Sequence, residues 1–151
     1  MNEGSAILLP DAPALVSRGQ TGLLVYPDGE IAEVAASDAP TWAQERVILC
    51  HARAISAYVG FKLTSPLDVL ELFAFVLPGT YCLPTTRGVA AALNLAKPQT
   101  LQDEAFALVN ITRTLLTLVR EWSKADAGKA MGIAQVLNNA GWAWGPAVLT
   151  A

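Results

Sequence analysis

The sequence predicts an α/β domain with a mixed central sheet and helices on both of its faces. Residues 47–50 form an apolar run typical of a buried strand, and a helical pattern follows directly. Residues 68–95 carry a second acid-bearing apolar segment and then a second helical pattern. Residues 14–34 hold short apolar runs separated by turn signals, which is typical of antiparallel strands. Strands that alternate with helices favour an α/β fold over a helical bundle or a β-sandwich.

Composition indicates one domain with an apolar surface. The chain has 151 residues, of which 53% are hydrophobic and 15% are charged, whereas a typical soluble domain has about 25% charged residues. The best apolar run, residues 69–77, contains Glu71 and is too short to span a membrane. We therefore expect no membrane partner and an exposed apolar face that docks on another protein or on a second copy. An alanine-rich chain with an ordinary surface is the alternative.

Net charge and cysteine content bear on whether this chain binds nucleic acid and on the state of its cysteines. The net charge is −3 and no Lys/Arg-rich run occurs, so a broad electrostatic footprint for nucleic acid is absent. Cys50 and Cys82 lack the spacing of metal ligands, and residues 1–4 lack the basic segment of a signal peptide. These features predict reduced cysteines in a cytoplasmic protein.

The first third of the chain predicts a meander of three antiparallel strands after an extended segment over residues 1–13. Pro27-Asp28-Gly29 is a strong turn signal between two apolar runs. The expected strands cover residues 14–16, 23–26 and 30–34. Residues 35–46 are expected to form a connecting helix or loop before an inner strand at 47–50.

The rest of the chain is expected to be mainly helical. Ala54, Ile55, Tyr58 and Val59 share one helix face, whereas residues 67–76 fit either a strand that runs into a helix or a helix alone.

Further helices are predicted from their capping residues. Thr85 or Thr86 can cap a helix that ends near Leu93, and Asp126 is expected to cap another helix with Met131, Ile133, Ala134 and Leu137 as its apolar positions. Thr100, followed by Asp103, is expected to start the longest helix, residues 100–122. The apolar sequence after residue 141 suggests a piece of a longer chain, because free ends are normally polar.

Four motifs occur in an order that resembles the DnaQ-type (DEDD) 3′–5′ exonucleases. They are Cys50-His51-Ala52, Asp68-Val69-Leu70-Glu71-Leu72, Leu77-Pro78-Gly79 and Ala92-Leu93-Asn94-Leu95. The resemblance implies a ribonuclease H-like fold over residues 1–124, with residues 125–151 as helices that lead toward a further domain. Residues 70–76, 82–85 and 141–149 also resemble the N-terminal region of alphaproteobacterial DinG-type (XPD-like) ATP-dependent DNA helicases.

The resemblance also implies that catalysis has been lost. At the positions where the family has metal-binding carboxylates, this chain has Ser17, Gly19, Ser56 and Ala107, and at the position of the general base it has Gln102. These neutral side chains cannot hold two divalent metal ions or accept a proton from water. We therefore expect no catalytic, cofactor-binding or metal-binding residue in this chain. ATP and Mg²⁺ are expected only in a helicase motor, which would be the partner of this domain.

Weak contact with single-stranded DNA is expected from Arg18, Arg53 and Arg87, which the resemblance places on the former active-site side. The only histidine, His51, is interpreted as structural, and Asp68 with Glu71 as a solvated helix start.

Two alternatives remain open. One is an active exonuclease with non-standard ligands; the other is an unrelated dimerisation or binding module. The acids that would have to converge in the first are Asp28, Glu30, Asp68 and Asp103.

Overall fold

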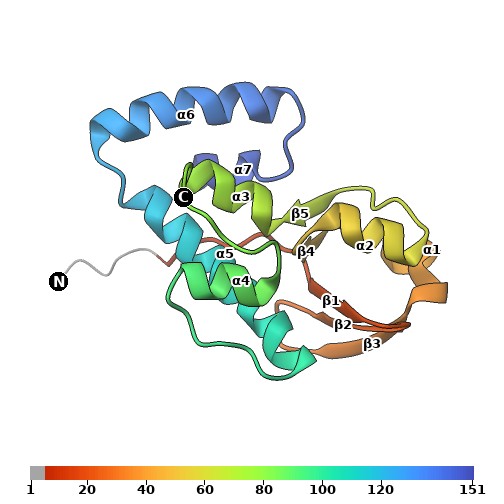
Figure 1. Cartoon of the computed structure of the whole chain (residues 1–151). Coiled ribbons are helices and arrows are strands. Elements are labelled where there is room, and N and C mark those ends of the chain that lie inside the picture. The colour runs from red at the N-terminus through yellow and green to blue at the C-terminus, as the bar shows by residue number, and fades with distance from the viewer. Residues whose placement is uncertain (1–5) are drawn as a thin grey trace.

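The computed structural model describes residues 6–151, in which a five-stranded mixed sheet has the order β3-β2-β1-β4-β5 (Figure 1). The strands are β1 (Ala14–Arg18), β2 (Thr21–Val25), β3 (Ile31–Ala35), β4 (Val47–Leu49) and β5 (Pro66–Asp68). The helices are the 3₁₀ turn η1 (Ala36–Asp38), α1 (Ala39–Trp42), α2 (Ala52–Val59), α3 (Val69–Val76), α4 (Thr86–Ala92), α5 (Leu101–Arg120), α6 (Lys124–Asn139) and α7 (Gly145–Thr150). The predicted α/β fold with a mixed sheet is confirmed. Residues 1–5 lie outside the described residues. The expectations of an extended segment and of no signal peptide are therefore not tested there.

The predicted meander is confirmed in β1, β2 and β3. Leu15 pairs with Leu24, and Leu23 pairs with Glu33, both in antiparallel register. The turn between β2 and β3 is closed by Asp28, whose Oδ1 accepts a hydrogen bond of 2.9 Å from the Glu30 backbone N–H. Gly29 has a φ of 91°, which L side chains rarely adopt, so the Asp-Gly signal has a local physical cause.

The second half of the sheet is parallel. Ile48 of β4 lies beside Ala14 of β1, and Leu67 of β5 lies beside Ile48. The predicted inner strand next to β1 is therefore confirmed. Residues 67–76 turn out to be the end of β5 followed directly by α3, which decides between the two possibilities left open by the periodicity.

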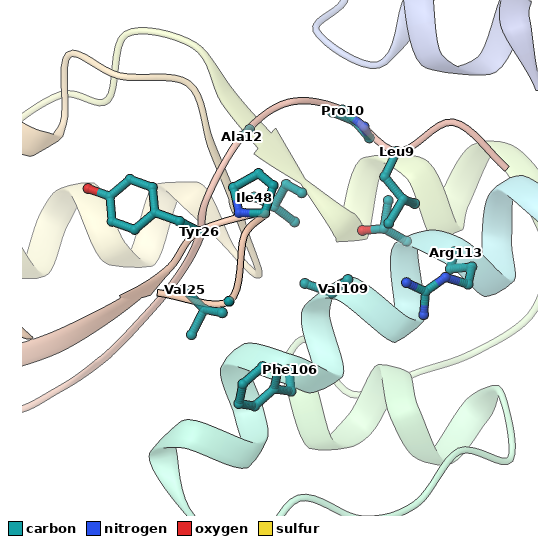
Figure 2. A pocket seen from close by; sticks show the side chains of 12 residues that line it. Leu9, Pro10, Ala12, Val25, Tyr26, Ile48, Phe106, Val109 and Arg113 are labelled. Atoms are coloured by element: carbon teal, nitrogen blue, oxygen red, sulfur yellow. The ribbon is translucent and has the colours of Figure 1, made fainter. Parts of the chain in front are cut away.

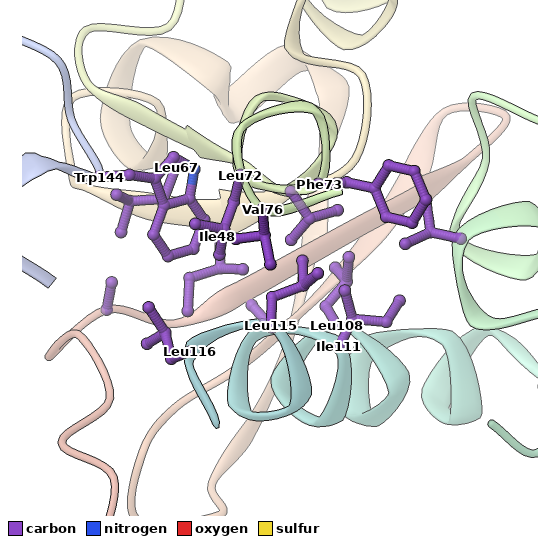
Figure 3. Packing of buried hydrophobic residues seen from close by; sticks show 14 of the residues in the cluster. Ile48, Leu67, Leu72, Phe73, Val76, Leu108, Ile111, Leu115, Leu116 and Trp144 are labelled. Atoms are coloured by element: carbon purple, nitrogen blue, oxygen red, sulfur yellow. The ribbon is translucent and has the colours of Figure 1, made fainter. Parts of the chain in front are cut away.

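Side chains that alternate along the strands build a core on each face of the sheet. Ala14 and Val16 belong to the larger cluster, and Leu15 belongs to the smaller one. In the larger cluster, α3 packs against α5 on one face of the sheet (Figure 3). The smaller cluster is closed by α1 and α2 on the opposite face. The expected helices on both faces are thus present.

Caps fix the helix starts at specific residues. Thr100 and Asp103 form a reciprocal capping box at the start of α5, and the 20-residue α5 is the longest helix in residues 6–151, as predicted. Thr85 caps α4, with its Oγ1 2.9 Å from the Gly88 nitrogen. The expected cap at Asp126 is wrong: Ser123 is the N-cap of α6, and Asp126 lies in the first turn, where its N–H donates to Ser123 Oγ.

The C-terminal segment shares the larger core. Trp144 and Val148 are fully buried there, although α6 itself lies mostly outside the body of the molecule (Figure 1). Among the predicted apolar positions of α6, Ala134 is fully buried, whereas Ile133 is 53% exposed. No helix in residues 6–151 combines the length and apolar content that a membrane span requires.

Candidate functional site

Asp68 ties together the ends of two neighbouring strands. Its Oδ1 accepts hydrogen bonds from the backbone N–H groups of His51, at 2.9 Å, and Leu70, at 3.0 Å. Its Oδ2 accepts a third from Ala52 N–H at 2.7 Å. One carboxylate therefore satisfies free N–H groups at the starts of both α2 and α3. The residue is only 8% exposed, so the interpretation of Asp68 as a solvated helix start is wrong: it is a buried cap.

His51 holds the backbone conformation that makes this arrangement possible. It has φ 67° and ψ 64°, in the left-handed region that residues other than glycine rarely adopt. The turn directs two successive N–H groups, those of His51 and Ala52, onto the Asp68 carboxylate. The structure thus gives His51 a backbone role at the end of β4.

Burial lowers the reactivity of the Cys50 thiol. The pKa of the Cys50 thiol is raised to about 12. Burial is the largest cause, the nearby Asp68 carboxylate is the second and Cys82 is the third, whereas a hydrogen bond with Thr86 lowers the pKa in part. Burial also raises the pKa of Cys82. The thiolate is the nucleophile and metal ligand, so a raised pKa lowers the reactivity of both thiols.

Two of the three predicted DNA-contact residues meet at one acid. Arg18 Nη2 lies 3.4 Å from Glu104 Oε1, and Arg87 Nε lies 3.2 Å from the same oxygen. The Arg18 and Arg87 side chains stay 61% and 43% exposed, whereas that of Glu104 is 17% exposed. Arg53 is exposed in the first turn of α2 and takes no part in either ion pair.

The positions that the resemblance assigns to lost metal ligands are not gathered together. Ser17 and Gly19 border a hollow on the α2 side of the sheet, lined also by Ala54, Ile55 and Tyr58. Gln102 and Ala107 belong to α5, which packs on the opposite face with Ala14 and Val16. Ser56 faces the loop after α2, where its Oγ is 3.5 Å from the Leu63 nitrogen.

The acids of the alternative nuclease hypothesis are also kept apart. Asp28 closes the β2–β3 turn next to Glu30, and Asp103 accepts hydrogen bonds from Gln99 and Thr100 at the start of α5. Asp68 is engaged by three backbone N–H groups. Within residues 6–151, no three His, Cys, Asp or Glu side chains come together in a way that could hold a metal ion.

An apolar surface lies between α3 and α6. Phe75 of α3 packs its ring against Trp122 and Trp142, with ring centroids 5.9 and 5.0 Å apart. An open hollow of about 460 Å³ beside these rings is lined by Phe75, Trp122 and Ile133 among others. Val136, on the next turn of α6, is 68% exposed. We call these side chains of Phe75, Trp122, Ile133 and Val136 the α3–α6 surface.

The interactions that join distant segments of the chain at this site have no local sequence signal. Glu104, the common partner of Arg18 and Arg87, carries no signal beyond its place in the first turn of α5. The sequence also gives no sign that the indole Nε1 of Trp144 donates to the distant Asp68 carbonyl.

The arrangement therefore has a buried capping carboxylate, a Cys50 thiol with a raised pKa, two arginines that share one acid, and an exposed apolar surface. Comparisons of the chain with protein-family models, with curated proteins and with solved structures give no match.

Proposed function

We propose that this chain is a non-catalytic, ribonuclease H-like accessory domain that docks on another protein segment and contacts single-stranded DNA weakly. The observation that carries the proposal is the strand order. An antiparallel β1-β2-β3 meander is extended by β4 and β5, each parallel to β1, in the order β3-β2-β1-β4-β5. A ribonuclease H-like sheet, which the exonuclease resemblance implies, has this order.

Loss of catalysis is supported by the charge at the end of β1. In the exonuclease resemblance, acids at the end of the first strand meet an acid from the long helix. Here the side chain that reaches α5 from the end of β1 is Arg18, and it pairs with Glu104. Two-metal hydrolysis needs several converging carboxylates, and a guanidinium among them repels divalent cations.

Docking is supported by the α3–α6 surface. Ile133 and Val136 are 53% and 68% exposed, beside a hollow with aromatic walls. Exposed apolar side chains next to an aromatic hollow are typical of protein interfaces. The partner that the helicase resemblance favours is the ATP- and Mg²⁺-binding motor of a DinG-like helicase, with the domain acting in the cytoplasm.

Weak DNA contact is supported by Arg18 and Arg87. Their guanidinium groups are about half exposed and close enough to share one carboxylate, so a phosphate could replace Glu104 as their partner. The chain's net charge of −3 keeps this contact weak. Arg53 would add a further contact along the strand.

The proposal is tested by incubating purified protein with Mg²⁺ or Mn²⁺ and end-labelled single-stranded DNA. The expected result is no trimming of the 3′ end. Activity that survives repurification and disappears in Asp28→Asn or Asp103→Asn, at acids of the alternative nuclease hypothesis, would overturn the proposal and favour the active nuclease. Asp68→Ala is a poorer test, because removing the Asp68 carboxylate also removes the cap of two helices.

A further inference from the structure

A hollow of about 190 Å³ lies between α5, the residue 9–12 segment and the β2–β3 turn (Figure 2). Val25 is the last residue of β2, Ile48 is the middle residue of β4, and Phe106 and Val109 come from α5. The hollow is thus enclosed by segments that are distant in the sequence and held in place by the larger core.

Several polar groups of the lining are already hydrogen-bonded within the protein. Thr112 is fully buried, and its Oγ1 donates to the Leu108 carbonyl at 2.9 Å. Tyr26 N–H donates to the Glu30 carbonyl, and Gly29 N–H donates to the Tyr26 carbonyl, each at 2.9 Å. Water gains little in a hollow whose polar groups are already bonded, so the interior suits an apolar body.

Arg113 carries the only charge among the residues that line this hollow. Figure 2 shows its guanidinium turned back along α5 toward Val109, below Leu9. Nη1 donates to Asn110 Oδ1 at 3.0 Å, and within residues 6–151 no carboxylate side chain pairs with the guanidinium. A guanidinium has five N–H donors in a planar fork that matches a carboxylate, so most of its donors remain for an anion.

We propose that this hollow binds a small organic acid: a compact apolar body with a single carboxylate. The body would contact Val25, Ile48 and Val109, and the carboxylate would pair with Arg113 at the mouth. The volume, about six times that of a molecule in liquid water, limits the ligand to the size of a short-chain fatty acid. This site is independent of the proposed accessory function and uses none of its residues.

The test titrates hexanoate and, separately, its neutral analogue 1-hexanol into ¹⁵N-labelled protein and follows amide shifts by NMR. Hexanoate is expected to shift amides around Val25, Ile48 and Val109 and to bind at least about tenfold tighter than 1-hexanol. Arg113→Gln is expected to remove this preference and leave 1-hexanol binding unchanged. Arg53→Gln, which removes one positive charge from exposed α2, is the matched control and should keep the preference.

A second variant fills the hollow. Val109→Phe is expected to abolish binding of both ligands, and an unchanged thermal unfolding midpoint would show that the fold persists. Arg113 is exposed, so Arg113→Gln tests the proposal even if the filling variant unfolds. Three results would overturn the proposal. The parent protein could bind the two ligands equally well, the preference for hexanoate could survive in Arg113→Gln, or the amide shifts could be confined to another surface.

Discussion

The indole Nε1 of Trp144 donates a hydrogen bond of 2.7 Å to the backbone carbonyl of Asp68, 76 residues earlier in the chain. Both groups are buried, and the Asp68 carboxylate on the same residue caps α2 and α3. The segment after α6 is therefore fastened to the point where β5 becomes α3.

Replacement of Trp144 by Phe should lower the free energy of unfolding by about 1–3 kcal/mol, because the Asp68 carbonyl would stay buried without its donor. Trp144→Ala should lower it by about 3–5 kcal/mol, since a large cavity is added. Urea unfolding followed by far-ultraviolet circular dichroism measures both. The control is Trp122→Phe at a half-buried ring, and an equal loss there would contradict the special role of Trp144.

Asp68→Ala should lower the free energy of unfolding by about 3–5 kcal/mol, because three backbone N–H groups lose a charged acceptor. Asp68→Asn should lower it less, since the amide keeps one acceptor oxygen. Asp126→Ala, at the exposed start of α6, serves as the matched control and should change it by about 1 kcal/mol or less. Hydrogen exchange at the His51, Ala52 and Leu70 amides should rise in Asp68→Ala; unchanged exchange would argue against the cap.

Glu104→Gln should strengthen binding of single-stranded DNA at low salt, because it frees Arg18 and Arg87 from their shared partner. Fluorescence anisotropy against salt concentration should show a slope steeper by about one unit for each arginine that gains a phosphate. Glu121→Gln removes the same charge from the exposed end of α5. If both variants gain equally, net charge and not the freed arginines explains the effect.

Cys82 should react with iodoacetamide before Cys50 in the folded protein. With a pKa of about 12, Cys50 at pH 8 is thiolate in about one molecule in 10⁴. Peptide mass spectrometry after timed labelling distinguishes the two sites, and labelling in urea should remove the difference. Faster labelling of Cys50 than of Cys82 would show that the thiol is not held protonated.

Glu71 should make a small contribution to stability that decreases as pH rises. Burial and then the nearby Asp68 carboxylate raise the pKa of Glu71, so its neutral form is favoured in the folded state. The stabilisation is fully present below the ordinary glutamate pKa and is lost as pH rises through the raised folded-state value. Glu71→Gln should flatten this dependence by a few tenths of a kcal/mol, since the side chain is largely exposed. Unfolding midpoints from pH 4 to 7 would measure it; identical pH profiles would contradict it.

Local features of the fold were predictable because their causes lie within a few residues. The turn at Asp28 and Gly29 depends on one side-chain hydrogen bond and one positive φ. The start of α5 depends on Thr100 and Asp103, three residues apart. In both cases the residue types carry the structural cause themselves.

The candidate site was less predictable because it depends on pairings across the chain and on strand register. Whether residue 17 or residue 18 faces α5 is a shift of one position, which moves a side chain to the opposite face of the sheet. The structure directs Arg18 to α5 and Ser17 to the α2 side. The hydrogen bond from Trp144 to the Asp68 carbonyl likewise joins residues 76 positions apart, which no local pattern encodes.

The mixed sheet also sets an order of events during synthesis. The β1–β2–β3 meander pairs neighbouring segments, so it can form once residue 35 leaves the ribosome. β4 must then close a longer loop to lie beside β1, and Asp68 can cap α2 and α3 only after β5 arrives. Trp144 and Val148 emerge only after all five strands, so until then the nascent domain holds a sheet whose larger core lacks these two side chains.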